Sequence, residues 1–522
     1  MEIKERNPVK KAKNGILNII FSRVFIVSIL LIIQLVLFAA GIIFMQDYAT
    51  YIYAGFLTLE VVSVIYIINS ESNSAFKITW IILIMVAPVL GAAFYAFVQM
   101  QPGTALLKRR LADLNKEVGQ YMQQDKEVLE ALRVSKPANA NMATYLNNQI
   151  SFPVYRNTEV TYFASGEEKF EEMKKQLRKA EHYIFLEYFI VEKGVMWNEI
   201  LDILKEKVWQ GVDVRFMYDG MCSMYILPYH YDKEMKRAGI KCKQFSPIRP
   251  ILSSYQNNRD HRKICVIDGK VAFTGGVNLA DEYINAKERF GHWKDTAVML
   301  EGDAVLSFTM MFLQMWNITE KRMEDYERYI EPKISDVKRE LGFVLPYGDS
   351  PYDNRNVGEQ VYLHILNHAK KYVHIMTPYL IVDDDLLSAI KYVAECGVEV
   401  SVIMPHIPDK WYAFAVARTY YEELMKAGVQ IYEYTPGFVH AKVFVSDNDT
   451  ATVGTINLDY RSLYHHFECG TFIYNNPAVW DIENDFQKTL KQCHKVTKED
   501  LKRRKIFEKV AGRVLRLIAP LM

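Results

Sequence analysis

A short motif, His-x-Lys-x-x-x-x-Asp, occurs twice in this chain of 522 residues. Its two copies hold the same three residue types: His261, Lys263 and Asp268 in HRKICVID, and His440, Lys442 and Asp447 in HAKVFVSD. A turn with glycine and asparagine follows each copy at a matched distance: Gly275, Gly276 and Asn278 in GGVNL, and Gly454 and Asn457 in GTINL. Two matched sets of residues predict a chain with two similar halves whose motifs form one active site.

The chemistry that suits each set follows from the geometry of a strand. Side chains alternate along a strand, so the histidine and the lysine, two positions apart, lie on one face. An imidazole can act as nucleophile or general acid near neutral pH, and a lysine can hold a phosphoryl oxygen and stabilise its charge. The asparagine adds an amide donor, and the glycine allows close approach of the backbone. The residues therefore favour phosphoryl transfer on a phosphate held between both sets.

Several of these residues also have plainer interpretations. A surface strand would explain one isolated histidine and lysine equally well, and it is the second copy with its own turn that favours catalysis. An aspartate at a strand end often serves a turn or an ion pair, so we expect structural roles for Asp268 and Asp447 within the motif. His465 and His466 are adjacent and would point to opposite faces of a strand, and no second cluster completes a coordination shell. No metal site is therefore predicted.

The motif and its downstream turn resemble the defining sequence of the phospholipase D superfamily, and the resemblance runs from about Tyr162 to the C-terminus. In that superfamily the two motifs meet across a pseudo-twofold interface. One histidine attacks the phosphorus of a phosphodiester, and the other protonates the leaving alcohol. The resemblance implies that His261 and His440 take these roles, with His261 favoured as the nucleophile. It implies no metal and no cofactor.

The same resemblance assigns further residues. Lys263 and Lys442 would act with the turn residues on the substrate phosphate, and those turn residues are Asn278, Asn457, Gly276 and Gly454. Superfamily members also place an acidic residue behind each histidine to orient its ring. The candidates here are Asp295 in HWKDT and Glu468 in HFECG.

The rest of the chain indicates an internal duplication. The apolar runs at 183–191 and 211–219 have counterparts at 372–382 and 397–405, and helical patterns such as WNEILDILKEKVWQG separate the runs. We therefore expect an α/β fold of two pseudo-twofold-related phospholipase D-type domains, each a mixed sheet covered by helices, preceded by N-terminal transmembrane helices. The expected parts are a membrane module at 1–105, a helical linker at 106–150, a first half at 151–335, a second half at 336–497 and a basic amphipathic helix at 498–522.

The N-terminal region contains long apolar runs. Val24–Met45 and Ile78–Val98 each hold about 20 residues, enough to cross a hydrocarbon core of about 30 Å. Tyr51–Ile68 is shorter and carries Glu60, so we expect two or three spans, with a buried soluble helix as the alternative for each run. Basic residues before the first run place the N-terminus in the cytoplasm, whereas the basic cluster at 108–110 argues for the same face after the last run. Three crossings would put these two basic segments on opposite faces of the membrane, whereas an even number would put them on the same face.

Charge and cysteine content exclude other classes. The 63 basic and 62 acidic side chains give a net charge of +1, so no broad cationic surface for nucleic acid is expected. The six cysteines show no Cys-x-x-Cys spacing, which argues against a zinc site or a disulfide framework. In the tail KEDLKRRKIFEKVAGRVLRLIAPLM, basic and apolar residues follow a helical spacing. Such a helix would lie on an anionic membrane or bury its apolar face on the rest of the protein.

The membrane module narrows the substrate to a phospholipid. Segments such as AFKITWIILIMVAPVLGAAFY, TPGFVHAK and NLDYRSLYHHFE resemble bacterial cardiolipin synthases over nearly the whole chain. The resemblance implies a multi-pass protein of the bacterial cell membrane that makes cardiolipin and glycerol from two phosphatidylglycerol molecules through a phosphatidyl-histidine intermediate. Its partners would be phosphatidylglycerol, other membrane phospholipids and the membrane itself; no nucleic acid partner and no particular oligomeric state are predicted. The alternatives are a phospholipase D hydrolase, another phosphatidyltransferase, and a non-catalytic scaffold, which two intact motifs disfavour.

Overall fold

The computed structural model describes residues 32, 33, 36, 48–99, 102–221, 226–246, 257–320, 324–330, 341–353 and 355–521. The chain divides into two compact units. The N-terminal unit holds the described residues up to Ala105, and the α/β unit holds nearly all described residues from Leu106 onward. Most of the predicted span Val24–Met45 lies outside the described residues.

The N-terminal unit contains three apolar helices, α3 (Ala49–Ile68), α4 (Ser74–Val86) and α5 (Pro88–Gln99). Within the described residues, the segment Thr50–Ile68 is the one helix that is long and apolar enough to cross a membrane. Gly91 lets α5 pack closely on α4, because a Cβ at this position would lie 2.7 Å from the Cα of Ile84.

The run Ile78–Val98, predicted as one spanning helix, is divided between α4 and α5. Ala87 leaves the helical conformation with φ −143° and ψ 77°. The cause is Pro88, since a proline has no N–H and disfavours a helical conformation in the residue before it. The helices have 13 and 12 residues. Each is therefore roughly 20 Å long, which is short of a hydrocarbon core of about 30 Å.

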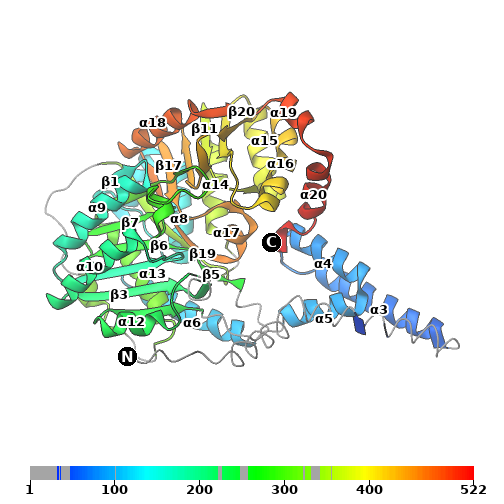
Figure 1. Cartoon of the computed structure of the whole chain (residues 1–522), viewed down its shortest axis with the longest axis horizontal. Coiled ribbons are helices and arrows are strands. Elements are labelled where there is room, and N and C mark those ends of the chain that lie inside the picture. Colours follow the sequence, from blue (N-terminus) through cyan, green and yellow to red (C-terminus); the bar gives the residue numbers. More distant parts are fainter. Residues whose placement is uncertain are drawn as a thin grey trace, which may run out of the picture. The chain divides into compact units, whose positions relative to one another are not determined.

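The α/β unit contains two large mixed sheets (Figure 1). The first has seven strands, which lie in the order β1 (Thr158–Phe163), β9 (Ala297–Gly302), β7 (Val271–Gly275), β6 (Lys263–Ile267), β2 (Tyr183–Tyr188), β3 (Asp213–Asp219) and β4 (Lys241–Phe245). Strands β2, β3 and β4 are parallel, and the pairs on the other side of β2 are antiparallel.

The second sheet repeats this arrangement. Its main path is β10 (Phe343–Asp349), β19 (His466–Tyr474), β17 (Thr450–Gly454), β16 (Val443–Ser446), β11 (Tyr372–Met376), β13 (Glu399–Pro405), β14 (Gln430–Tyr434) and β20 (Cys493–Lys495). Strand β16 pairs with β11 as β6 pairs with β2, and β11, β13 and β14 are again parallel. The two motif strands therefore occupy matching places in the two sheets.

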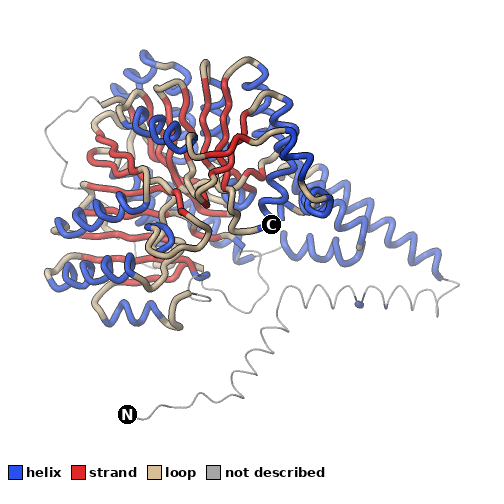
Figure 2. Tube along the Cα trace, turned by 45° about the horizontal axis from the view of Figure 1, so that its top comes forward, coloured by secondary structure: helices blue, strands red, loops and turns tan. Residues whose placement is uncertain are grey.

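Helices pack against both sheets (Figure 2). One of them, α13 (Val305–Asn317), contacts strands of both sheets. The central strands are covered on both faces, and every residue of β2 is buried. The main covering helices are α9 (Gly166–Lys179), α10 (Val195–Trp209), α14 (Val357–His368), α15 (Asp384–Glu395), α16 (Trp411–Lys426) and α18 (Ala478–Leu490). Shorter helices include α12 (Tyr231–Arg237) and α17 (Tyr460–Tyr464).

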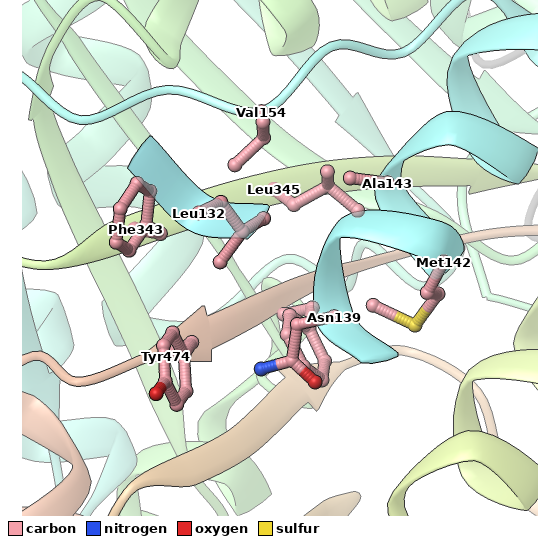
Figure 3. A pocket seen from close by; sticks show the side chains of 9 residues that line it. Leu132, Asn139, Met142, Ala143, Val154, Phe343, Leu345 and Tyr474 are labelled. Atoms are coloured by element: carbon pink, nitrogen blue, oxygen red, sulfur yellow. The ribbon is translucent and has the colours of Figure 1, made fainter. Parts of the chain in front are cut away.

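The segment predicted as a helical linker forms α6 (Pro102–Gly119), α7 (Lys126–Ser135) and α8 (Pro137–Ile150). Side chains of α7 and α8 meet those of β10 and β19 around a small apolar pocket (Figure 3). Leu132, Met142, Phe343 and Leu345 are among the residues that line it. Helices α7 and α8 are thus fixed on the second sheet through apolar contacts.

Two short parallel strand pairs connect the halves of the α/β unit. Strand β5 (Arg259–Asp260) pairs with β19, and β15 (Gly437–Val439) pairs with β8 (His292–Lys294). Strand β5 ends directly before His261, and β15 ends directly before His440. Each motif histidine therefore follows a short strand of its own half that is paired with a strand of the other half.

Candidate active site

The backbone of each motif histidine is held by the opposite half of the α/β unit. The amide of His261 donates to the carbonyl oxygen of Phe467 at 2.9 Å, and the amide of His440 donates to that of Lys294 at 2.7 Å. Both contacts extend the short strand pairs that connect the halves. The matching geometry places the two histidines in equivalent positions.

The residue after each of these carbonyls is an acid that contacts the histidine ring. Nδ1 of His261 lies 2.8 Å and 3.0 Å from the carboxyl oxygens of Glu468, and Nδ1 of His440 lies 2.7 Å from Oδ2 of Asp295. Both acids are fully buried. With an oxygen accepting from Nδ1–H, the lone pair of each neutral ring is on Nε2, which is then the atom available for chemistry.

Both imidazoles are neutral near pH 7. Burial, reinforced by the charge of Lys263 and by His466, holds the pKa of His261 well below its usual range. Burial, followed by the charge of Lys442, lowers the pKa of His440 to about 4, although Asp295 acts in the opposite direction. A neutral imidazole keeps the lone pair that nucleophilic attack requires.

The motif lysines are buried beside their histidines. Nζ of Lys263 donates to the carbonyl oxygen of His261 at 2.6 Å, and Nζ of Lys442 donates to that of His440. Burial lowers the pKa of Lys263 to about 8 and the pKa of Lys442 to about 7. A bound phosphate would raise both pKa values, because a nearby negative charge favours the protonated amine.

The two turn asparagines differ in their hydrogen bonds. Asn278 accepts from the amide of Ile190 at 3.0 Å and donates to the hydroxyl of Tyr283 at 2.7 Å. Asn457 is buried, and its Oδ1 has no hydrogen-bond partner within the described part of the chain. The two asparagines thus occupy matching sequence positions but different surroundings.

The turn glycines allow close packing of the strands around the acids. A Cβ on Gly276 would lie 1.9 Å from Oδ1 of Asp295, and a Cβ on Gly454 would lie 2.5 Å from the carbonyl oxygen of Cys469. Any other residue at position 276 would collide with the carboxylate that contacts His440. The neighbour that requires a glycine at position 276 is therefore the carboxylate of Asp295.

The motif aspartates bind backbone amides at strand ends. Asp268 accepts from the amides of residues 181, 182 and 183 at 2.7–2.8 Å. Asp447 accepts from the amides of residues 370, 371 and 372 at 2.8–3.1 Å. Each carboxylate ties the end of its motif strand to the start of the neighbouring strand, β2 or β11. These contacts are structural in kind and involve neither imidazole.

Residues that the motif pattern did not single out also surround the histidines. The ring of His466 lies 5.8 Å from that of His261, and the hydroxyl of Thr455 donates to Glu468. Tyr283 and Trp293 lie 5.5 Å and 5.3 Å from His440. The alternation of β19 provides a signal for His466, because it lies two residues before Glu468 and so on the same face.

One acidic cluster lies outside the motifs. Among the described residues, Glu359, Asp383 and Asp385 are the group whose spacing would suit a metal ion. Tyr464 donates to both Glu359 and Asp383. The cluster contains no motif residue, and the chemistry of the two histidines can be described without it.

Comparisons with known proteins identify the family of this chain. Residues 173–316 and 362–490 match the family model of the cardiolipin synthase, phospholipase D-like domain, and residues 59–99 match the phospholipase D-nuclease N-terminal model. The chain is 33% identical to a cardiolipin synthase of Halalkalibacterium halodurans over 92% of this chain and 95% of the relative. It is 37% identical to cardiolipin synthase 2 of Bacillus anthracis over 70% and 71%, and 53% identical to an uncharacterized protein of Streptococcus mutans over 88% and 99%.

A solved structure shares the fold. The phosphatidylserine synthase of Haemophilus influenzae superposes with a TM-score of 0.53 at 16% identity, covering 74% of this chain and 98% of that one. Two duplicated mixed sheets with reciprocal histidine–acid pairs define an α/β protein of the phospholipase D type. Within that class, this chain belongs to the bacterial cardiolipin synthase family.

Proposed function

We propose that the enzyme transfers the phosphatidyl group of one phosphatidylglycerol molecule to a hydroxyl of a second one and releases glycerol. The observation that carries this proposal is the reciprocal pairing of two neutral histidines with acids of the opposite halves, in a chain of the cardiolipin synthase family. Phosphatidyl transfer needs one imidazole as nucleophile and one as proton carrier. The site holds both.

The surroundings of the two rings favour His261 as the nucleophile. Burial raises the pKa of Glu468 to about 8, so its carboxyl group is neutral near pH 7 and gives His261 no counter-charge. Asp295, in contrast, raises the pKa of His440 through its charge and its hydrogen bond. His440 is therefore better able to carry a proton, and His261 better able to keep its lone pair.

Binding of the anionic phosphate raises the pKa of His440, which takes up a proton on Nε2 before the reaction. In the first step, Nε2 of His261 attacks the phosphorus, the bond to the glycerol oxygen breaks, and the imidazolium of His440 gives that oxygen its Nε2 proton and becomes neutral. In the second step, His440 takes the proton from a hydroxyl of the second phosphatidylglycerol, whose oxygen attacks the phosphorus and displaces His261. Lys263 and Lys442 offset the negative charge on the phosphoryl oxygens, and Asn278 and Asn457 lie in the turns beside them. Bonds and protons balance over the two steps.

The protein is membrane-associated, and we propose that it crosses the bacterial cell membrane more than once. Thr50–Ile68 would be one crossing, and the apolar sequence Val24–Met45 the other. The short helices α4 and α5 would enter the bilayer without crossing it, as a hairpin. Two crossings return the chain to its starting face, in agreement with the basic residues at both ends of this region. The α/β unit would then be cytoplasmic.

The proposed reaction is tested with the detergent-purified full chain and phosphatidylglycerol as the sole lipid, without added metal. Mass spectrometry should detect cardiolipin and an equal amount of glycerol. Phosphatidic acid with glycerol would instead make water the acceptor, as in a phospholipase D hydrolase. No turnover would contradict both activities.

A further inference from the structure

We propose that the exposed face of the C-terminal helix α20 (Ile506–Arg516) is a docking surface for an anionic lipid bilayer. The proposal rests on the proposed membrane location of the enzyme and concerns a part of the chain that lies outside the catalytic residues. The docking surface is defined by six exposed apolar side chains: Ile506, Phe507, Val510, Val514, Leu517 and Ile518.

These six side chains form one stripe. Ile506, Phe507, Val510 and Val514 lie in α20, and their spacing of one, three and four residues places them on a single face of a helix with 3.6 residues per turn. Leu517 and Ile518 follow directly after its last residue. Ile506 is 81% exposed and Phe507 is 72% exposed. Exposed apolar residues that stand singly are ordinary, but a continuous stripe of large ones marks an interaction surface.

The helix is attached to the α/β unit by its other side. A Cβ on Gly512 would lie 2.4 Å from the carbonyl oxygen of Ala415, so α20 and α16 touch at a glycine. Arg516 lies 4.0 Å over the ring of Tyr420, and Arg504 donates to the carbonyl oxygen of Arg418 at 3.0 Å. Figure 1 shows α20 in red beside α16. Within the α/β unit, the predicted alternative in which this helix buries its apolar face is therefore wrong.

The charge of the residues around the docking surface identifies its binding partner. Glu508 is the single acid in α20. The basic residues that precede and flank the stripe are Lys502, Arg503, Lys505, Lys509 and Arg513. The N-terminal unit, although apolar, offers little complementary charge, because Glu60 and Glu71 are the acids within residues 48–99. Anionic lipids carry that charge at every headgroup, and an apolar stripe with basic flanks binds at the interface of such a bilayer.

The docking surface is connected to the active site. The ring of His465 hydrogen-bonds to the backbone of Pro520, just beyond α20. The next residue, His466, is the one whose ring lies 5.8 Å from that of His261. Docking of α20 would therefore hold the side of the site that contains His466 near the lipid surface.

The test uses the full chain in phosphatidylglycerol vesicles, with Cys222, Cys396 and Cys493 replaced by serine. An environment-sensitive fluorophore is attached at Val510→Cys in one variant and at Asp202→Cys, on the polar exposed side of α10, in the control. Nitroxide groups on the lipid acyl chains should quench the first probe several-fold more than the second. The difference should shrink in phosphatidylcholine vesicles.

Equal quenching of both probes would overturn the proposal. If the Val510→Cys probe is then also protected from aqueous iodide, protein covers the stripe; if it is accessible to iodide, the stripe is in water. A triple variant, Ile506→Ser, Phe507→Ser and Val510→Ser, should lose activity on vesicles and keep it in detergent micelles. Failure of the wild type to make cardiolipin in micelles would contradict the proposed function, whereas quenching would still test the docking surface.

Discussion

Glu468 contacts Nδ1 of His261 at 2.8 Å although 207 residues separate the two in the chain. Asp295 and His440 repeat the relationship across 145 residues. The acid that contacts each ring therefore comes from the half that does not contain the histidine. The two pairs differ in charge, since burial raises the pKa of Glu468 to about 8, and this difference leads to the first prediction.

Replacement of the two acids by amides should have unequal effects. Asp295→Asn removes the charge that raises the pKa of His440, so kcat should fall by about 10²–10⁴, the range for loss of a positioned proton carrier. Glu468→Gln replaces a group that is already neutral and should cost less than about tenfold. Initial rates of cardiolipin formation measure both, with Asp202→Asn as an exposed control. Equal losses would contradict the assigned charges.

The nucleophile can be identified with a phosphatidyl ester of p-nitrophenol, a leaving group that needs no proton. His440→Ala should still release about one equivalent of p-nitrophenol per enzyme molecule, because attack by His261 remains possible. His261→Ala should release none, and both variants should be inactive on phosphatidylglycerol. A burst in His261→Ala but not in His440→Ala would reverse the two roles. Circular dichroism checks that both variants fold.

The buried lysines predict a loss of kcat/KM at alkaline pH. Burial lowers the pKa values of Lys442 and Lys263 to about 7 and about 8, so each ammonium is present below its pKa and is lost as the pH rises through it. Binding of the anionic lipid should therefore weaken between about pH 7 and pH 8. The corresponding decline in kcat should occur at higher pH, because bound phosphate raises both pKa values.

Lys442→Arg provides the matched variant for this pH profile. A guanidinium stays protonated throughout the range, so any remaining activity should lose the lower of the two alkaline transitions. An unchanged profile would show that Lys442 does not cause the decline.

Gly276→Ala should inactivate the enzyme through Asp295. The new Cβ would lie 1.9 Å from the carboxylate, so either the acid or the backbone must move. Overpacking of this kind costs about 1–3 kcal/mol of stability, and displacement of the acid should cost activity beyond that. Gly348→Ala is the control, because its Cβ would find ordinary contacts of 3.4 Å or more. The melting temperature and kcat are measured for both variants.

The proposed topology can be tested with single cysteines in inverted and right-side-out vesicles. Lys10→Cys and Lys126→Cys should react with a membrane-impermeant maleimide on the cytoplasmic face. Ser70→Cys, which follows the second proposed crossing, should react on the cytoplasmic face as well, and Asp47→Cys, between the two proposed crossings, should react on the opposite face. Labelling of Lys10→Cys and Lys126→Cys on opposite faces would require an odd number of crossings.

Sequence reasoning predicted the α/β class because strand and helix periods are local properties of the chain. The repeat in the motifs has its counterpart in the matching strand orders of the two sheets. The pairing of each acid with the distant histidine could not be predicted in the same way, since it depends on the strand pairs β5–β19 and β8–β15. These pairs contain two or three residues each, too few to leave a periodic signal.

Two other features show where apolar patterns alone mislead. The run Ile78–Val98 has the composition of a membrane-spanning helix, but Pro88 interrupts the helix and divides the run into α4 and α5. The position of His466 beside His261 is not among the predictions, although strand alternation places His466 on the face of Glu468. Local backbone chemistry and side-chain direction thus add information that average hydropathy does not contain.

The strand pairs β5–β19 and β8–β15 have a consequence for shorter proteins. A polypeptide that ended at the first sheet would contain His261 but neither Phe467 nor Glu468, and its own Asp295 would have no histidine to contact. Such a polypeptide could assemble a complete centre only by exchanging these strands with another copy of itself. The duplication in this chain places both partners in one molecule, so that assembly of the histidine–acid pairs does not depend on protein concentration.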